Sequence, residues 1–176
     1  MSRTMRTCPT RLRLVSKEGR PCYGKLVCAP TRRLVLVDIE NYCGKGVLCP
    51  EDIRTAKEEI SRDLTLLDDD LVVIGTSHGK NCLVCGTEWR GPRQVLRSGH
   101  DGADIALIEA SQDYVLDTFS SVVIVSGDGI FTDLVSAVRT RRKRVTVVSG
   151  RGRLSHRLQL AASVVKHCDP QFKPAA

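Results

Sequence analysis

From residue 34 onward the chain alternates short apolar runs with longer amphipathic segments. The apolar runs are typical of buried parallel strands and lie at 34–38, 70–77, 93–99, 121–129 (with its exit loop) and 144–150. Segments with helical patterns follow them at 49–67, 79–89, 101–116, 130–143 and 154–165. Strands that alternate with helices form right-handed βαβ units, so helices cover both faces of the sheet. We therefore expect an α/β fold, a three-layer sandwich with a mostly parallel central sheet.

Residue types at the element boundaries agree with this division. Pro50 suits the first turn of the helix at 49–67, and Glu51 and Asp52 suit its positive end. The last helical segment, 154–165, has room to run into a short strand. A parallel sheet covered in this way is Rossmann-like in general form.

The positive charge of the chain is concentrated at its N-terminus. Residues 1–33 hold nine Lys or Arg and one Glu, a formal charge of +8, whereas the whole chain carries +7 and the remainder therefore −1. We expect three parts: a basic arm or hairpin at 1–31, one domain at 32–168 and a C-terminal tail at 169–176. A basic arm on a near-neutral domain suggests a polyanionic partner such as nucleic acid, and a solvated tail is the alternative.

Composition narrows the class of protein. Hydrophobic residues make up 41% and charged residues 27%, which is ordinary for a globular domain. No apolar run approaches the roughly 18 residues that cross a bilayer, and no apolar segment of a secretory signal follows the basic N-terminus. We expect a cytoplasmic protein without membrane contact, and the sequence leaves a homodimer open.

The chain has eight cysteines, which we interpret as small hydrophobic residues or reduced thiols. Cys82 and Cys85 form a C-x-x-C pair. One such pair cannot close a tetrahedral zinc site, and the flanking residues of a thioredoxin-like redox site are missing.

Acidic residues follow three of the five predicted strands. They are Asp38 and Glu40, Asp101 and Asp104, and Asp128. Parallel strands end at one edge of the sheet, where ligands bind, so these side chains are expected to converge there. Each acid alone has a simpler explanation as a helix cap, but clustered carboxylates raise each other's pKa unless a cation neutralises them. Mg²⁺ takes such oxygen ligands, and the set suits metal-assisted attack of water on a phosphodiester.

Polar and basic side chains at the same predicted edge are candidates for phosphate contacts. They are Ser77, His78, Lys80, Ser126, Arg151 and Arg153. The basic run at 139–144 lies at the opposite edge, where it suits a helix C-terminus or a solvated face. The phosphate-binding G-x-x-x-x-G-K-[ST] motif and the dinucleotide motif G-x-G-x-x-G are both absent from the sequence.

Three ordered segments resemble the NYN domain of the PIN-like nuclease superfamily, most closely its single-domain bacterial type. They read LVLVDIENYCG at 34–44, DGADIALIEAS at 101–111 and VVIVSGDGIFTDLVSAVR at 122–139, and the resemblance extends over about 32–168. It implies a PIN-like sheet and a ribonuclease that depends on Mg²⁺ or Mn²⁺ and acts on RNA. The implied catalytic positions are Asp38, Asn41, Asp104 and Asp128. The three aspartates are the implied metal ligands, and the asparagine would orient a water or a phosphate oxygen.

The chain departs from the family pattern at one position. Many members read S-G-D-x-D-F, and Ile130 stands here in place of the second Asp. Asp133, one helical turn later, is a candidate replacement. Glu40 is expected on the same side as Asp38, because alternation on an extended segment would put positions 38 and 40 together. It is a candidate ligand or a group that supports one.

Two other functions fit parts of the pattern. One is a non-catalytic RNA- or partner-binding module on the same fold, which the missing second Asp permits. The other is a haloacid-dehalogenase-like, Mg²⁺-dependent phosphatase, because VDIENY followed by SGDGIFTD is similar to the acidic motifs of that class. That class needs D-x-D, and the third position here is Glu40.

Overall fold

A six-stranded, all-parallel sheet forms the centre of the protein. The computed structural model describes residues 32–112 and 116–168, so the basic arm at 1–31 and the tail at 169–176 lie outside the described residues. The strand order is β3-β2-β1-β4-β5-β6. The strands are β1 (Arg33–Asp38), β2 (Leu71–Thr76), β3 (Arg93–Leu96), β4 (Ser121–Val125), β5 (Arg144–Ser149) and β6 (Val164–His167). The expected α/β fold is confirmed, and the sheet is parallel throughout.

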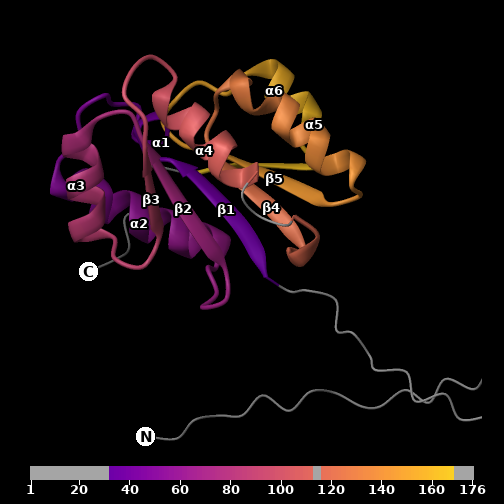
Figure 1. The fold of residues 1–176 in the computed structure, drawn as a ribbon, viewed down its shortest axis with the longest axis horizontal. Coiled ribbons are helices and arrows are strands. Elements are labelled where there is room, and N and C mark those ends of the chain that lie inside the picture. The colour runs from indigo at the N-terminus through magenta and orange to yellow at the C-terminus, as the bar shows by residue number, and fades with distance from the viewer. Residues whose placement is uncertain (1–31, 113–115, 169–176) are drawn as a thin grey trace, which may run out of the picture.

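Helices cover both faces of this sheet (Figure 1). One face carries α1 (Ile39–Cys43), α2 (Pro50–Leu64) and α3 (Gly79–Glu88). The other carries α4 (Gly102–Gln112), α5 (Thr132–Thr140) and α6 (His156–Ala161), with the 3₁₀ turns η1 (Leu116–Thr118) and η2 (Gly129–Phe131). The three-layer arrangement expected from the alternation of strands and helices is therefore confirmed.

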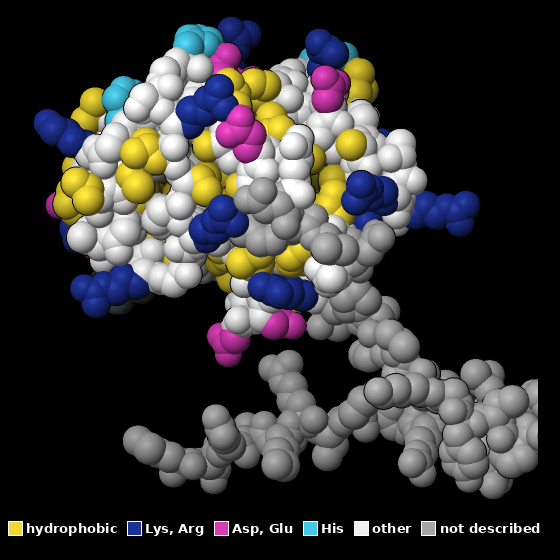
Figure 2. Space-filling model, viewed as in Figure 1, with side chains coloured by type: hydrophobic (Ala, Val, Ile, Leu, Met, Phe, Trp, Pro, Cys, Tyr) yellow, Lys and Arg dark blue, Asp and Glu magenta, His cyan; other side chains and the backbone are white. Residues whose placement is uncertain are grey.

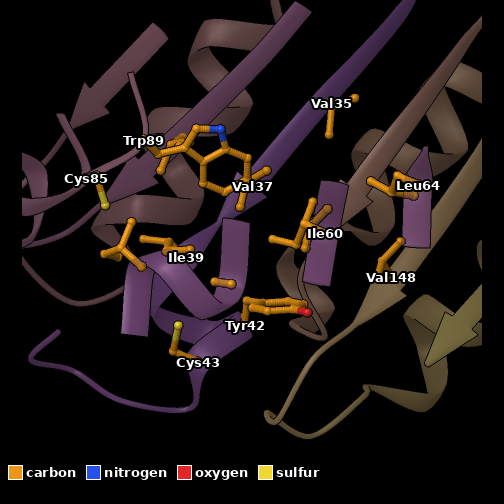
Figure 3. Close-up of a cluster of buried hydrophobic side chains, with 14 of the residues drawn as sticks. Val35, Val37, Ile39, Tyr42, Cys43, Ile60, Leu64, Cys85, Trp89 and Val148 are labelled. Atoms are coloured by element: carbon orange, nitrogen blue, oxygen red, sulfur yellow. The ribbon is translucent and has the colours of Figure 1, made fainter. Parts of the chain in front are cut away.

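The central strand β1 is buried on both sides, which explains its uninterrupted apolar sequence. Leu34 and Leu36 pack into the cluster under α4, α5 and α6. Val35 and Val37 point to the other face, where Figure 3 shows them among side chains from α1 and α2 such as Ile39 and Ile60, and near Trp89. These four aliphatic side chains of β1 are fully buried. Such a strand reads as a continuous hydrophobic run.

The structure corrects the predicted local structure in two places. The segment after β1 is not extended, because a short helix, α1, begins directly at Ile39. The predicted helix at 130–143 is a 3₁₀ turn followed by α5, which ends at Thr140. The short strand for which the last helical segment left room is present: α6 is followed by the edge strand β6, which pairs with β5.

The strand order of the sheet reverses at β1. From β1 it passes outward through β2 to β3, and it then returns to β4 on the other side of β1. The loops that leave β1 and β4 therefore run in opposite directions and open a crevice at the carboxyl edge. Asp38 ends β1, and Asp128 lies just after β4, so both acids flank this crevice.

Candidate active site

The turn after β1 is built around Asp38. Its carboxylate accepts a hydrogen bond from the backbone N–H of Asn41 (3.2 Å) and caps α1. The helix ends after five residues at Gly44, whose φ of +66° lies in the left-handed region that favours glycine. The following loop therefore turns back over the carboxyl edge, and the cap holds the Asp38 carboxylate at the end of the strand.

Asp38 and Asp104 form a buried carboxyl pair. Their exposed fractions are 3% and 6%, and their side chains share a hydrogen bond. Burial, followed by the charge and the hydrogen bond of Asp38, raises the pKa of Asp104 to about 8. Burial also raises the pKa of Asp38, against the opposing effect of its bonds to Asn41, Asp104 and Ser126. One carboxylate of the pair is therefore protonated at neutral pH unless a cation is present.

A hydrogen-bond network joins this pair to the exit of β4. The fully buried Ser126 hydroxyl donates to Asp38 Oδ2 (3.1 Å) and accepts from the Asp128 backbone N–H (3.1 Å). Asn41 Oδ1 accepts from the Gly127 N–H (2.9 Å). Asp128 Oδ1 accepts from the Ile130 N–H (3.0 Å) and so caps η2. The Asn41 side chain thus joins the β1 turn to the β4 turn, and its oxygen is already engaged.

Glu40 belongs to a second network, which joins α1 to the start of α3. Its carboxylate accepts from the Ser77 N–H (3.0 Å) and hydroxyl, and from Asn81 Nδ2 (2.6 Å). The Asn81 amide also donates to Gly46 O (2.9 Å) and accepts from the Leu48 N–H (3.0 Å). Glu40 and Asn81 therefore anchor the loop that follows α1. Glu40 is near the acid pair because of this helical turn, and the predicted extended alternation is wrong.

These groups surround a cavity of about 220 Å³ at the carboxyl edge. Its acidic lining residues are Asp38, Glu40, Asp101 and Asp104, and the other lining side chains include Asn41, Lys45 and Ser77. Asp101 is exposed at the rim of the cavity and has a φ of +54°. Its Oδ1 lies 2.8 Å from Nδ1 of His100. Asp128 is outside this lining, but its charge contributes to the raised pKa of Asp104. The cavity thus gathers the acids that follow β1 and β3.

One predicted acidic-site position, Asp133, lies elsewhere. Asp133 is exposed and lines a groove between α4 and α5 together with Ile130 and Leu134. Ile130 packs against the hydrophobic cluster beneath those helices. The carboxylate of Asp133 therefore joins the α4–α5 surface and is not brought to the acid pair.

The predicted phosphate-binding residues do not form one cluster, and each has its own surroundings. The Arg151 guanidinium is bound to Glu59 of α2 (3.0 Å), on the side of the sheet that carries α1 and α2. Lys80 and Arg153 are exposed. His78 is largely exposed, with Nδ1 2.8 Å from the Ser77 hydroxyl and 3.6 Å from Glu40. The Ser77 and Ser126 hydroxyls are engaged with Glu40 and Asp38, so they hold acids in place.

The donor atoms of the acid pair fit a hard divalent cation. Asp104 Oδ1 is buried and has no hydrogen-bond partner among residues 32–112 and 116–168, and such an orphaned oxygen is costly unless a ligand satisfies it. Carboxylate oxygens are the ligands that Mg²⁺ and Mn²⁺ prefer. Within those same ranges, no three His, Cys, Asp or Glu side chains converge closely enough to hold a metal ion. A three-carboxylate site therefore requires the Asp128 side chain to turn toward the pair.

Sequence reasoning missed two residues of this site. Asn81, 1% exposed, holds both Glu40 and the loop after α1. The sequence feature that could have revealed Asn81 is a polar amide in the first turn of a helix that begins at the carboxyl edge. Lys45 lines the cavity. The sequence feature that could have revealed it is its position between two glycines, directly after the acidic turn.

The fold and the acid pair define an α/β protein with a carboxylate crevice at its topological switch point. The family model of the NYN domain matches residues 77–168, which is more than half of the chain. The chain therefore belongs to the NYN domain family, within the PIN-like superfamily. The matched region includes Asp104 and Asp128, whereas Asp38 and Asn41 precede it.

A solved structure from Vibrio parahaemolyticus, of a protein of unknown function, has the same fold. It is 19% identical to this chain, with a TM-score of 0.58, and the match covers 82% of this chain and 97% of the Vibrio chain. The comparison with curated proteins finds no match. NYN domains are generally nucleases, and the fold here is nuclease-like. In the described part of the chain, every helix is too short or too polar to cross a membrane.

Proposed function

We propose that this protein is a metal-dependent ribonuclease whose active site is the acidic cavity of the domain at 32–168. The observation that carries the proposal is the buried Asp38–Asp104 pair with its unpartnered Asp104 oxygen. Membership of the NYN family supports a nuclease, and RNA is the substrate on which NYN nuclease domains act. Exposed basic residues at the carboxyl edge, such as Lys80 at the start of α3, suit contact with phosphates.

Asp38, Asp104 and Asp128 would hold Mg²⁺ or Mn²⁺. Such an ion, when bound, makes a water more acidic and offsets negative charge on a phosphate. The protein's own contribution is positioning: Ser126 and the cap to Asn41 fix the Asp38 carboxylate. The Asp104 carboxyl would release its proton to become a ligand, so the pair would carry both negative charges only with a cation bound.

Cleavage of labelled RNA by the purified full chain tests this proposal. Single-stranded and hairpin RNAs are incubated with Mn²⁺, Mg²⁺ or EDTA, beside the variants Asp38→Asn and Asp128→Asn. Both substitutions keep a side-chain oxygen that can cap the following turn, so the fold should persist while cleavage falls by at least about a hundredfold. Asp68→Asn, at an exposed position at the opposite edge of the sheet, is the matched control and should cut like the wild type.

The outcomes separate the alternatives. Cleavage by Asp38→Asn at the wild-type rate would falsify the proposed site. RNA binding without cleavage under any metal condition would favour the non-catalytic module. That second candidate is supported by the position of Ile130, which packs in the α4–α5 groove where other family members carry an acid. Phosphate bound covalently to Asp38 would favour the phosphatase, although Glu40 is already held by Ser77 and Asn81.

A further inference from the structure

The acidic cavity has a cationic residue on its rim. Lys45 is the sole Lys or Arg among the described residues that line this cavity, whose lining also includes four carboxyl side chains. A polyanion that approaches such a site meets repulsion, because like charges at close range are unfavourable. A cation on the rim reduces this repulsion at the point of entry.

The loop that carries Lys45 is anchored on both sides of that residue. The Lys45 N–H donates to Glu40 O (3.1 Å), and the preceding Gly44 N–H donates to Asn41 O (3.0 Å). Beyond Lys45, the buried Asn81 amide binds Gly46 O (2.9 Å) and the Leu48 N–H (3.0 Å). The backbone at Lys45 is therefore fixed relative to the acid pair, and the long side chain keeps its freedom.

The Lys45 side chain has a partner that it can leave at little cost. Its Nζ donates to Asp52 Oδ1 (2.6 Å), and the lysine side chain is 55% exposed. Exposed pairs of this kind add little stability. Asp52 has a role of its own, because its other oxygen accepts from the Cys49 N–H (3.1 Å) at the start of α2. Movement of Lys45 toward a ligand would thus leave the helix cap in place.

We propose that Lys45 is a phosphate-binding residue of the acidic cavity, which moves from Asp52 to a backbone phosphate of bound RNA. This inference rests on the proposed ribonuclease function and names a phosphate contact that was not among those predicted from the sequence. Figure 2 shows Lys and Arg side chains spread over the face that carries α4 and α5 instead of gathered into one patch. Because Lys45 is the one cation of the cavity lining among the described residues, we expect it to have a large share in placing the phosphate at the site.

The test measures binding of a short fluorescein-labelled single-stranded RNA by fluorescence anisotropy. EDTA is present so that metal-dependent cleavage does not occur. Lys45→Met should weaken affinity roughly three- to tenfold at low salt and lower the slope of log affinity against log salt by about 0.7, as expected for one lost phosphate contact. Lys166→Met is the matched control, because that amine is bound to Asp63 O on α2, away from the cavity. It should keep the wild-type salt slope.

Asp52→Asn separates a phosphate contact from a structural role. The amide keeps an oxygen for the Cys49 N–H but releases Lys45, so RNA affinity should equal or exceed that of the wild type. If Lys45→Met and Asp52→Asn weaken binding equally, the ion pair is only structural and the inference is wrong. If the wild type binds and cuts RNA while Lys45→Met behaves like Lys166→Met, this inference alone fails. If the wild type neither binds nor cuts RNA, the proposed function fails and the inference with it.

Discussion

At the scale of single residues, the environment of Asp104 decides how the site behaves. The side chain is 6% exposed, it shares a hydrogen bond with Asp38, and one of its oxygens has no partner among the described residues. A carboxyl group is ordinarily ionised at neutral pH, whereas here the pKa is raised to about 8. The metal-free protein therefore keeps a proton in its core, and a bound cation would displace it.

This proton makes the stability of the metal-free protein depend on pH. The folded pKa of Asp104 is raised, so its stabilisation is complete below the unfolded pKa of about 4 and is lost as pH rises through about 8. In EDTA, the free energy of unfolding should fall between pH 5 and pH 8 by roughly 3–4 kcal/mol more in the wild type than in Asp104→Asn. Urea unfolding at the two pH values measures this difference.

The matched control for this prediction is Asp68→Asn, at an exposed position, which should follow the wild-type pH dependence. Parallel curves for the wild type and Asp104→Asn would show that Asp104 titrates normally.

At the scale of elements, the short helix α1 is the feature that arranges the site. It places Asp38 at its N-cap and Glu40 in its first turn, and it ends at Gly44. The loop after β5 packs closely on it: a Cβ at Gly152 would lie 2.7 Å from Asn41 O, so only glycine fits there. The helix is too short to persist by itself, and its position depends on tertiary contacts such as those of Asn81.

Asn81→Ala should destabilise the fold and loosen the loop after α1. It removes three hydrogen bonds and leaves the Leu48 N–H, which lies in a buried contact, without an acceptor. We expect a loss of about 3 kcal/mol in the free energy of unfolding, measured in urea, and faster hydrogen exchange at Leu48. Gln159→Ala, an exposed amide on α6, is the control and should change stability by less than about 0.5 kcal/mol. A loss equal to that of the control would mean that Asn81 does not anchor the loop.

At the scale of the whole molecule, the proposed cation site in the acid cluster would couple cation binding to folding. The cavity draws its residues from α1, the β2 exit and the start of α4, which come together only in the folded chain. The unfolded chain cannot offer this site, so a cation that binds it must stabilise the fold. The Asp104 proton would oppose binding of a cation, so the stabilisation by the cation should grow with pH.

Saturating Mn²⁺ or Mg²⁺ should therefore raise the melting temperature of the wild type. At a hundredfold excess over the dissociation constant the gain is about 2.7 kcal/mol, which corresponds to roughly 5–10 °C for a chain of this size. The shift should be larger at pH 8 than at pH 5 and should disappear in Asp104→Asn. Differential scanning fluorimetry at constant ionic strength measures it. A shift of equal size in Asp104→Asn would place the cation elsewhere.

The sequence by itself determined the order of strands and helices and the edge of the sheet to which the acids belong. Apolar runs such as 34–38 identify buried strands, and parallel strands all end at the same edge, so the loops that carry Asp38, Asp104 and Asp128 could be assigned without coordinates. This reasoning needs only local periodicity and the handedness of βαβ units.

Only the tertiary structure decided where the individual side chains at that edge point. Glu40 is held by Ser77 and Asn81, which are 37 and 41 residues away in the sequence, and Arg151 is held by Glu59, 92 residues away. Asp133 turns into the α4–α5 groove, and Lys45 comes to the rim of the cavity. Side-chain direction depends on the exact backbone turn and on competition among distant partners. Neither is encoded in the local pattern of residue types.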